Sequence, residues 1–298
     1  MNRREFLKAV PLGLATAAGA RFSWLTNNPP GRLRYWLDSS LRSAPPPGLV
    51  DPLTDEGAAP KHPDLDKIRR FDESYPDDFH LAESRLDTLH AAAARFGRLQ
   101  SLVGHGNFNL LSFDKMLALS RSFPAVGAFP VAELDFLEEL FFADAARYGF
   151  FGEKVIEQMA ARIPDRAVVK VAGSGHYLLK GEPLEKFRRI RRDVGESITL
   201  TSGVRSLVKQ YHLFLTKAVE TGGNLSRASR SLAPPGYSFH ARGDFDLGKV
   251  GFGLDNFTEE FCRTDEYRKL IDLGYVSIRY TPENPFGVRH EPWHIKIA

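Results

Sequence analysis

The chain has 298 residues, of which 43% are hydrophobic and 26% are charged, and its formal net charge is +3. These fractions are ordinary for a soluble globular protein, and they exclude a fibrous repeat or disorder throughout. The near-neutral balance gives no reason to expect nucleic acid as a partner. Because Cys262 is the single cysteine, an internal disulfide is also excluded, and we expect it to be a buried apolar side chain rather than a nucleophile.

The first residues have the pattern of an export signal. Arg3 and Arg4 precede an apolar stretch of small residues, Ala9–Ala20, that ends in Ala-Gly-Ala. This stretch is shorter than the roughly 20 residues that a membrane-spanning helix needs. We therefore predict that residues 1–20 are a twin-arginine signal peptide, and that the mature protein is periplasmic or extracellular. Signal removal takes away three basic side chains and one acidic side chain, which lowers the net charge from +3 to +1 and leaves no stable membrane span.

The rest of the chain divides into three stretches by composition. Residues 21–62 are rich in proline and glycine and are predicted to be a linker or strap. Residues 63–162 have helical apolar spacing and are predicted to be a helical region of unknown role, with helices at Leu81–Leu102, Ser112–Ser122 and Val131–Tyr148. In residues 163–298, short β-rich segments alternate with helices, which indicates an α+β domain. Its expected strands are Ala167–Ala172, Ser197–Thr201, Gly274–Tyr280 and Trp293–Ile297, and its expected helices are Pro183–Arg192 and Val204–Thr221.

The segment from Val204 has the clearest helical pattern, because its apolar residues recur on one face. Ser202 is the expected N-cap, and Gly222 with Gly223 is the expected stop.

Two segments carry residues suited to metal chemistry. A glycine-rich loop at 235–248 contains His240, Asp244 and Asp246, and the end of the chain contains Glu291 and His294. A catalytic zinc takes about three nitrogen or oxygen ligands, an open position for water, and a carboxylate beside that water. The two segments together supply this set. Strand alternation in 293–297 would send His294 to the face opposite Trp293 and Ile295.

These residues resemble the VanY-type zinc D-alanyl-D-alanine and L,D-carboxypeptidases. The family signature Glu-x-Trp-His is complete at 291–294. The signature Ser-x-His-x-x-Gly-x-Ala-x-Asp matches at Ser238, His240 and Gly243, but the aspartate comes one residue early, as Asp246, and Phe245 replaces the small residue. The Asp-Leu-Gly that begins at Asp246 matches the family's Asp-Val-Gly and favours Asp246 as the third ligand, with Asp244 as the alternative.

A third family segment, Ser-Gly-Tyr-Arg-Ser followed by Gln, corresponds to residues 202–206 with Gln210. The resemblance covers roughly residues 165–298 and implies a small antiparallel sheet with flanking helices, as in hedgehog and D,D-peptidase domains. It implies zinc ligands His240, Asp246 and His294, and catalytic roles for Glu291, as general base, and Arg205. It further implies that Arg205, Gln210 and Ser238 bind the substrate, a peptidoglycan stem peptide that would lose its C-terminal D-amino acid.

Four alternatives were weighed against this interpretation. A calcium loop at Asp244 would need glycine where Lys249 stands, and a serine hydrolase built on Ser238 lacks the strand–elbow–helix context. A zinc endopeptidase that cuts within stem peptides or cross-links stays open, because substrate length depends on loops. A non-catalytic, zinc-containing wall-binding protein would need neither Glu291 nor Arg205.

Overall fold

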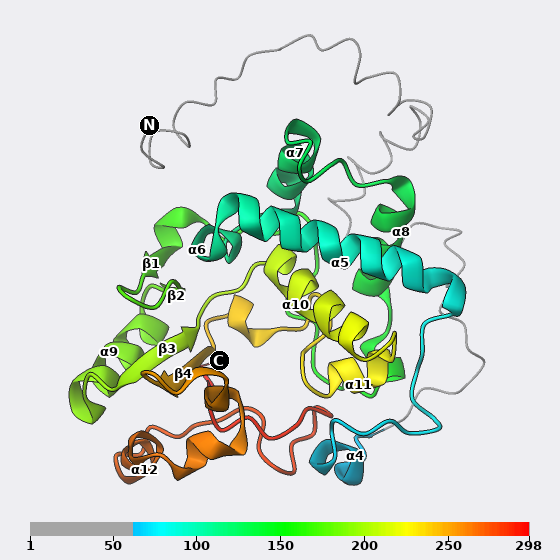
Figure 1. Cartoon of the computed structure of the whole chain (residues 1–298). Coiled ribbons are helices and arrows are strands. Elements are labelled where there is room, and N and C mark those ends of the chain that lie inside the picture. Colours follow the sequence, from blue (N-terminus) through cyan, green and yellow to red (C-terminus); the bar gives the residue numbers. More distant parts are fainter. Residues whose placement is uncertain (1–61, 298) are drawn as a thin grey trace. The chain divides into compact units, whose positions relative to one another are not determined.

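The computed structural model describes residues 62–297, which form an α+β fold of small antiparallel sheets and flanking helices (Figure 1). The predicted fold class is therefore confirmed. The predicted signal peptide at 1–20 and nearly all of the linker at 21–62 lie outside the described residues. Within 62–297 there is no helix with the length and apolar character needed to cross a bilayer. The domain boundary near residue 163 stays a prediction.

The region before residue 163 is helical, as expected. Its helices are α4 Leu65–Arg69, α5 Glu83–Val103, α6 His105–Phe108, α7 Phe113–Ser122, α8 Val131–Phe142 and the 3-10 helix η1 Ala145–Tyr148. The long helix α5 buries Leu89, Phe96 and Leu99 on one stripe and packs against α10 (Figure 1). The predicted helix over 131–148 is interrupted after α8, where Asp144 accepts a hydrogen bond from the Ala146 amide (3.0 Å) and starts η1.

Helix α10 (Leu207–Glu220) begins three residues later than predicted. Its N-cap is Ser206, whose Oγ accepts from the Lys209 amide at 3.2 Å. The expected cap, Ser202, instead ends a strand, and its Oγ accepts from Arg205 Nε at 2.9 Å. The predicted stop is confirmed: Gly223 takes a positive φ of 84° and donates its amide to the Ala218 carbonyl at 2.8 Å.

The central sheet has three antiparallel strands in the order β3 (Ile198–Ser202), β4 (Phe245–Lys249) and β5 (His294–Ile295). Ser202 pairs with Asp246, which in turn pairs with His294. This register therefore brings a serine, an aspartate and a histidine from three distant segments into one row. A second sheet pairs β1 (Val168–Lys170) with β2 (Tyr177–Leu179).

One face of the central sheet is covered by an apolar core. Phe245 and Leu247 of β4, and Trp293 and Ile295 around β5, all point into it. Helix α9 (Glu182–Val194) packs there through Leu184, Phe187, Ile190 and Val194, and α12 (Asp265–Asp272) adds Tyr267 and Leu270. Alternation then places Asp246 and His294 on the opposite face, as predicted for 293–297. The remaining short elements are α11 Leu225–Ser229, η2 Asp165–Ala167, η3 Phe239–Ala241, η4 Gly253–Phe257 and η5 Glu259–Arg263.

Three sequence expectations differ from the structure. The predicted strand Gly274–Tyr280 is reduced to an isolated bridge between Ile278 and Ile295. Strand β4 lies in the segment that was expected to be a glycine-rich loop. Its Gly248 is required there, because a Cβ would come within 2.6 Å of Thr201 Cγ2 and 2.5 Å of Asn256 Cγ. Cys262 is only partly buried, but burial and Glu259 raise the pKa of its thiol to about 11, which agrees with an inert side chain.

Candidate metal centre

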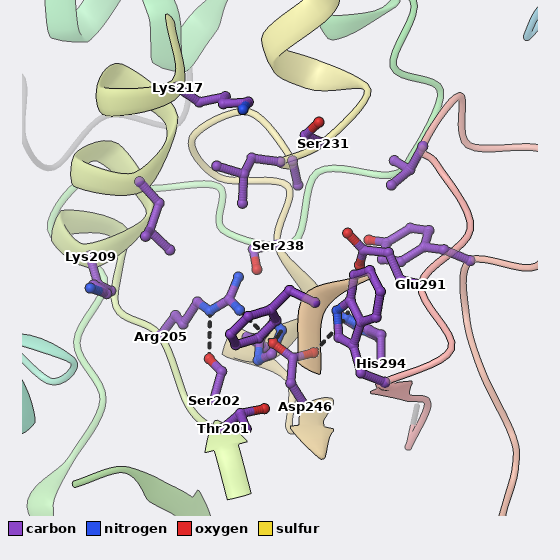
Figure 2. Close-up of a pocket in the computed structure, with 18 of the residues that line it drawn as sticks. Thr201, Ser202, Arg205, Lys209, Lys217, Ser231, Ser238, Asp246, Glu291 and His294 are labelled. Carbon is purple, nitrogen blue, oxygen red and sulfur yellow. Dashed lines mark hydrogen bonds and ion pairs between the residues drawn. The ribbon is translucent and has the colours of Figure 1, made fainter. Parts of the chain in front are cut away.

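Three buried side chains from separate elements converge beside the central sheet. They are His240 on η3, Asp246 on β4 and His294 on β5, and their ligand atoms lie within 4.8 Å of one another. Among the described residues, this is the one group of three or more such side chains arranged to hold a metal ion. Figure 2 shows Asp246 and His294 facing each other, with Arg205 on the other side of the aspartate.

The imidazole of His240 is fixed in one orientation by the backbone. Its Nδ1 lies 2.8 Å from the Gly203 carbonyl oxygen, which can only accept, so Nδ1 carries the hydrogen. The Nε2 lone pair then points to Asp246 Oδ2, 3.4 Å away. Burial, assisted by the charge of Arg205, lowers the pKa of His240 to about 4. His240 is therefore a neutral ring with an available lone pair, as a metal ligand requires.

His294 is held between two aspartates. Its Nε2 lies 3.0 Å from Asp244 Oδ2, and its Nδ1 lies 3.2 Å from Asp246 Oδ1. Asp244 is itself held by Arg279 and by the Ile297 amide, so it orients the ring from behind. Burial alone would lower the pKa of His294, but the two carboxylates raise it to about 9. The negative charge that favours a proton on Nδ1 also favours a divalent cation there.

The donor set fits zinc. His240 Nε2 and Asp246 Oδ1 are buried and have no hydrogen-bond partner, which is costly unless another group satisfies them. Two imidazoles and one carboxylate are a set that catalytic zinc accepts, with a fourth position open. Asp246 faces this point, whereas Asp244 lies on the far side of the His294 ring.

Glu291 lies beside the three candidate ligands. Its Oε2 is 3.6 Å from His294 Nδ1, and the residue is 8% exposed at the cavity wall. Burial raises the pKa of Glu291, although Arg289 and His294 act against this shift. A carboxyl group with a raised pKa next to a metal site is suited to accept and return a proton.

Arg205 is held by two neighbours in the cavity wall. Its Nη2 donates to Asp246 Oδ2 at 2.7 Å and its Nε donates to Ser202 Oγ (Figure 2). Despite burial, the neighbouring His240 and Arg205 hold the pKa of Asp246 well below its usual range. Among residues 62–297, the third guanidinium nitrogen of Arg205, Nη1, has no hydrogen-bond partner.

Of the other two predicted substrate-binding residues, one lines the cavity and the other does not. Ser238 is 5% exposed and lines the cavity, near η3. Gln210 is buried on α10, does not line the cavity, and donates its side-chain amide to the Ala233 carbonyl. Gln210 therefore supports the cavity wall at Ala233 instead of facing its interior.

The three candidate ligands, together with Glu291, Arg205 and Ser238, line one cavity of ≈ 540 Å³. This cavity runs from the candidate metal centre along α10 to Lys217 and Ser231 (Figure 2). Other lining residues were not found from the sequence. The ring of Tyr280 lies edge-on to His294, with centroids 4.8 Å apart. His105 comes from α6 in the helical region and Phe71 from the segment after α4. Since no local pattern distinguishes them, only the fold could have revealed them.

Comparison with protein families finds a match in the C-terminal part of the chain. Residues 180–297 match the VanY family, described as D-alanyl-D-alanine carboxypeptidase. No curated protein matches the chain.

Three solved structures are each similar to part of the chain. The LdcB LD-carboxypeptidase is 22% identical, with a TM-score of 0.36, and the alignment covers 43% of this chain and 62% of LdcB, which is less than two thirds of its length. A variant of the D,D-pentapeptidase VanY in complex with Zn(II) is 24% identical, with a TM-score of 0.35 and coverage of 45% and 81%. The D,D-dipeptidase VanXYg, in complex with a D-Ala-D-Ala phosphinate analogue, is 27% identical, with a TM-score of 0.33 and coverage of 40% and 50%.

Proposed function

We propose that the protein is a zinc-dependent carboxypeptidase that removes the C-terminal D-amino acid from peptidoglycan stem peptides, because residues 180–297 match the VanY family. The observation that carries this proposal is the convergence of His240, Asp246 and His294 in one cavity, with Glu291 Oε2 3.6 Å from His294 Nδ1. A structural zinc site is closed by four protein ligands. Three candidate ligands with a carboxylate beside them fit a catalytic site better, because the fourth position stays open for water.

His240, Asp246 and His294 would hold the zinc ion, which supplies Lewis acidity that polarises a carbonyl and activates water. Glu291 accepts the proton of the attacking water and returns it to the amine that leaves. Arg205 contributes in two ways: it neutralises part of the charge of Asp246, and its Nη1 offers a donor to the carbonyl oxygen as negative charge develops there.

The assay that tests this proposal uses zinc-loaded protein and defined tetra- and pentapeptide muropeptides, with mass spectrometry of the products. We expect loss of one C-terminal D-amino acid, abolished by a chelator and restored by added zinc. Cleavage of the pentapeptide alone would indicate D,D specificity, and cleavage of the tetrapeptide would indicate L,D specificity. Products cut inside the stem peptide would favour the endopeptidase alternative, and binding without any cleavage would favour the wall-binding alternative.

We further propose that the protein is exported by the twin-arginine route, because Arg3 and Arg4 precede a short apolar stretch and because a peptidoglycan substrate lies outside the cytoplasm. Replacing both arginines by lysine should retain the protein inside the cell in a fractionation experiment. Unchanged export of this variant would contradict the route.

A further inference from the structure

A cluster of basic side chains lies at one end of the cavity, apart from the metal centre. It comprises His105 on α6, His176 before β2, and Lys209 and His212 on α10. The rings of His105 and His176 are 5.1 Å apart and nearly perpendicular. Lys209 Nζ donates to Gln100 Oε1 of α5 at 2.9 Å. Among residues 62–297, none of the four basic side chains forms an ion pair with a carboxylate.

Lys209 is the buried member of the cluster, whereas His176 and His212 are half-buried and His105 is exposed. Lys209 is 7% exposed, and burial together with the charge of Arg205 lowers its pKa to about 8. The Nδ1 atoms of His176 and His212 are buried and have no hydrogen-bond partner. A buried cation and unsatisfied ring nitrogens cost stability, so their gathering in one cavity points to a ligand that completes them.

The chemistry of the missing ligand follows from these donors. An ammonium group and imidazole N–H groups favour a small anionic acceptor, and a carboxylate offers two oxygens to several donors at once. The cluster lines the same cavity as Arg205 and Asp246, and burial lowers the pKa of His176 to about 4, so that its ring is neutral. A peptide held at the metal centre is therefore within reach of the cluster.

We propose that Lys209, together with His105 and His176, forms a subsite that binds an ionised carboxyl group of the substrate. This inference rests on the proposed function, because it names the substrate class of the same cavity: peptides with a carboxylate near the scissile bond. The carboxylate comes either from the C-terminus of the peptide or from the side chain of an internal residue. The helical region supplies His105 and Gln100, so it completes the substrate site of the VanY-type domain.

Binding to zinc-loaded Glu291→Gln protein, measured by calorimetry, tests the subsite without turnover. The first pair of probes is D-alanyl-D-alanine and its C-terminal amide. The second pair is the pentapeptide stem with either diaminopimelate or lysine at its third position, which differ by one side-chain carboxylate. We expect Lys209→Met to lower the affinity for the acid-bearing member of one pair about tenfold, because a hydrogen bond to a charged group is lost. The affinity for the other member of that pair should not change. The affected pair identifies the source of the carboxylate.

Lys217→Met is the matched control, because Lys217 lies on the same helix and lines the same cavity but is paired with Glu220 at 3.0 Å. Lys217→Met should leave the binding of all four probes unchanged. Lys209→Arg should keep most of the affinity for the acid-bearing probe, because the positive charge is retained. His105→Gln, at an exposed position, should weaken the same acid-bearing probe while the fold is preserved. Equal effects of Lys209→Met on both members of each pair, or no effect on either pair, would overturn the subsite. Failure of the wild-type protein to cleave any muropeptide would overturn the proposed function and leave this binding result standing.

Discussion

At the scale of single residues, the proposed function assigns metal binding and proton transfer to different side chains. Glu291 stands 3.6 Å from His294 but outside the group of three ligands. Glu291→Gln should therefore keep zinc, while turnover falls about 10²- to 10⁴-fold, because the amide keeps the shape but cannot accept a proton. Elemental analysis and the muropeptide assay measure the two effects on one sample. Glu283→Gln, at an exposed glutamate, is the control, and a variant of Glu291 that retained most of its rate would exclude it as the base.

Asp244, which precedes β4, and Asp246, which lies on β4, should differ in the same way. Asp246→Ala removes a candidate ligand and should abolish tight zinc binding. Asp244→Asn leaves all three ligands in place but weakens the carboxylate that orients His294, so zinc affinity should fall about 10- to 100-fold. Competition with a chelator of known affinity measures both variants. The reverse order would show that Asp244 is the ligand.

The sequence favoured Asp246 over Asp244 as the third ligand, but it gave no separate role to Asp244. In an extended segment, residues two apart share one side, so both aspartates were candidates for the same metal position. The structure places them on the two nitrogens of one imidazole instead, because β5 brings His294 between them. The site residues in the motifs were predictable, whereas His105 and His176 meet only through the fold.

At the scale of elements, one buried ion pair anchors the segment that carries Phe71 into the cavity wall. Asp78, before α5, accepts from Arg230 at 2.8 Å and from Asn224 at 2.8 Å, and both partners lie at the ends of α11. Burial alone would raise the pKa of Asp78, but these partners lower it. Its stabilising contribution is therefore present above the unfolded carboxyl pKa of about 3.9 and is lost as the pH falls through the lower folded value.

Asp78→Asn should accordingly lower the free energy of unfolding by about 3 kcal/mol at neutral pH, since it leaves Arg230 buried without its charge partner. Urea unfolding at neutral and acidic pH measures this, and the loss should shrink at acidic pH. Asp77→Asn is the control, because the Asp77 side chain is 76% exposed. If Asp77→Asn lowered the free energy of unfolding by this amount and Asp78→Asn did not, the ion pair between Asp78 and Arg230 would not anchor the segment.

The elements themselves were predicted unevenly, for physical reasons. Helices with an unbroken apolar stripe, such as α5, were found nearly to the residue. The start of α10 was misplaced because Ser202 and Ser206 are both competent caps, and pairing of Ser202 with Asp246 in the sheet decides between them. Strand β4 was missed because Asp246 and Gly248 are poor strand formers, and their places there are set by the metal site and by close packing.

At the scale of the whole molecule, the helices before residue 163 and the α+β part after it meet at one side chain of α10. The ring of Tyr211 stacks on the ring of Phe96 of α5, with centroids 5.8 Å apart, and lies tilted against the ring of Phe113 of α7, with centroids 6.3 Å apart. Its hydroxyl donates to the Leu137 carbonyl of α8 at 2.5 Å, and the residue is 0% exposed. Three helices that precede residue 163 thus enclose a residue on the helix that follows Arg205.

We therefore expect residues 163–298 to be unable to fold alone, although the sequence divides there by composition. Removing the helical region would expose Tyr211 and its buried neighbours Phe214 and Leu215, each worth about 1.5–3 kcal/mol of burial. In the full chain, Tyr211→Phe should cost about 1 kcal/mol for the lost hydrogen bond, and Tyr211→Ala about 3–5 kcal/mol for the cavity that it leaves. Urea unfolding monitored by circular dichroism measures all three proteins. A fragment 163–298 that unfolds cooperatively, binds zinc and cleaves muropeptides like the full chain would show that the two parts are independent domains.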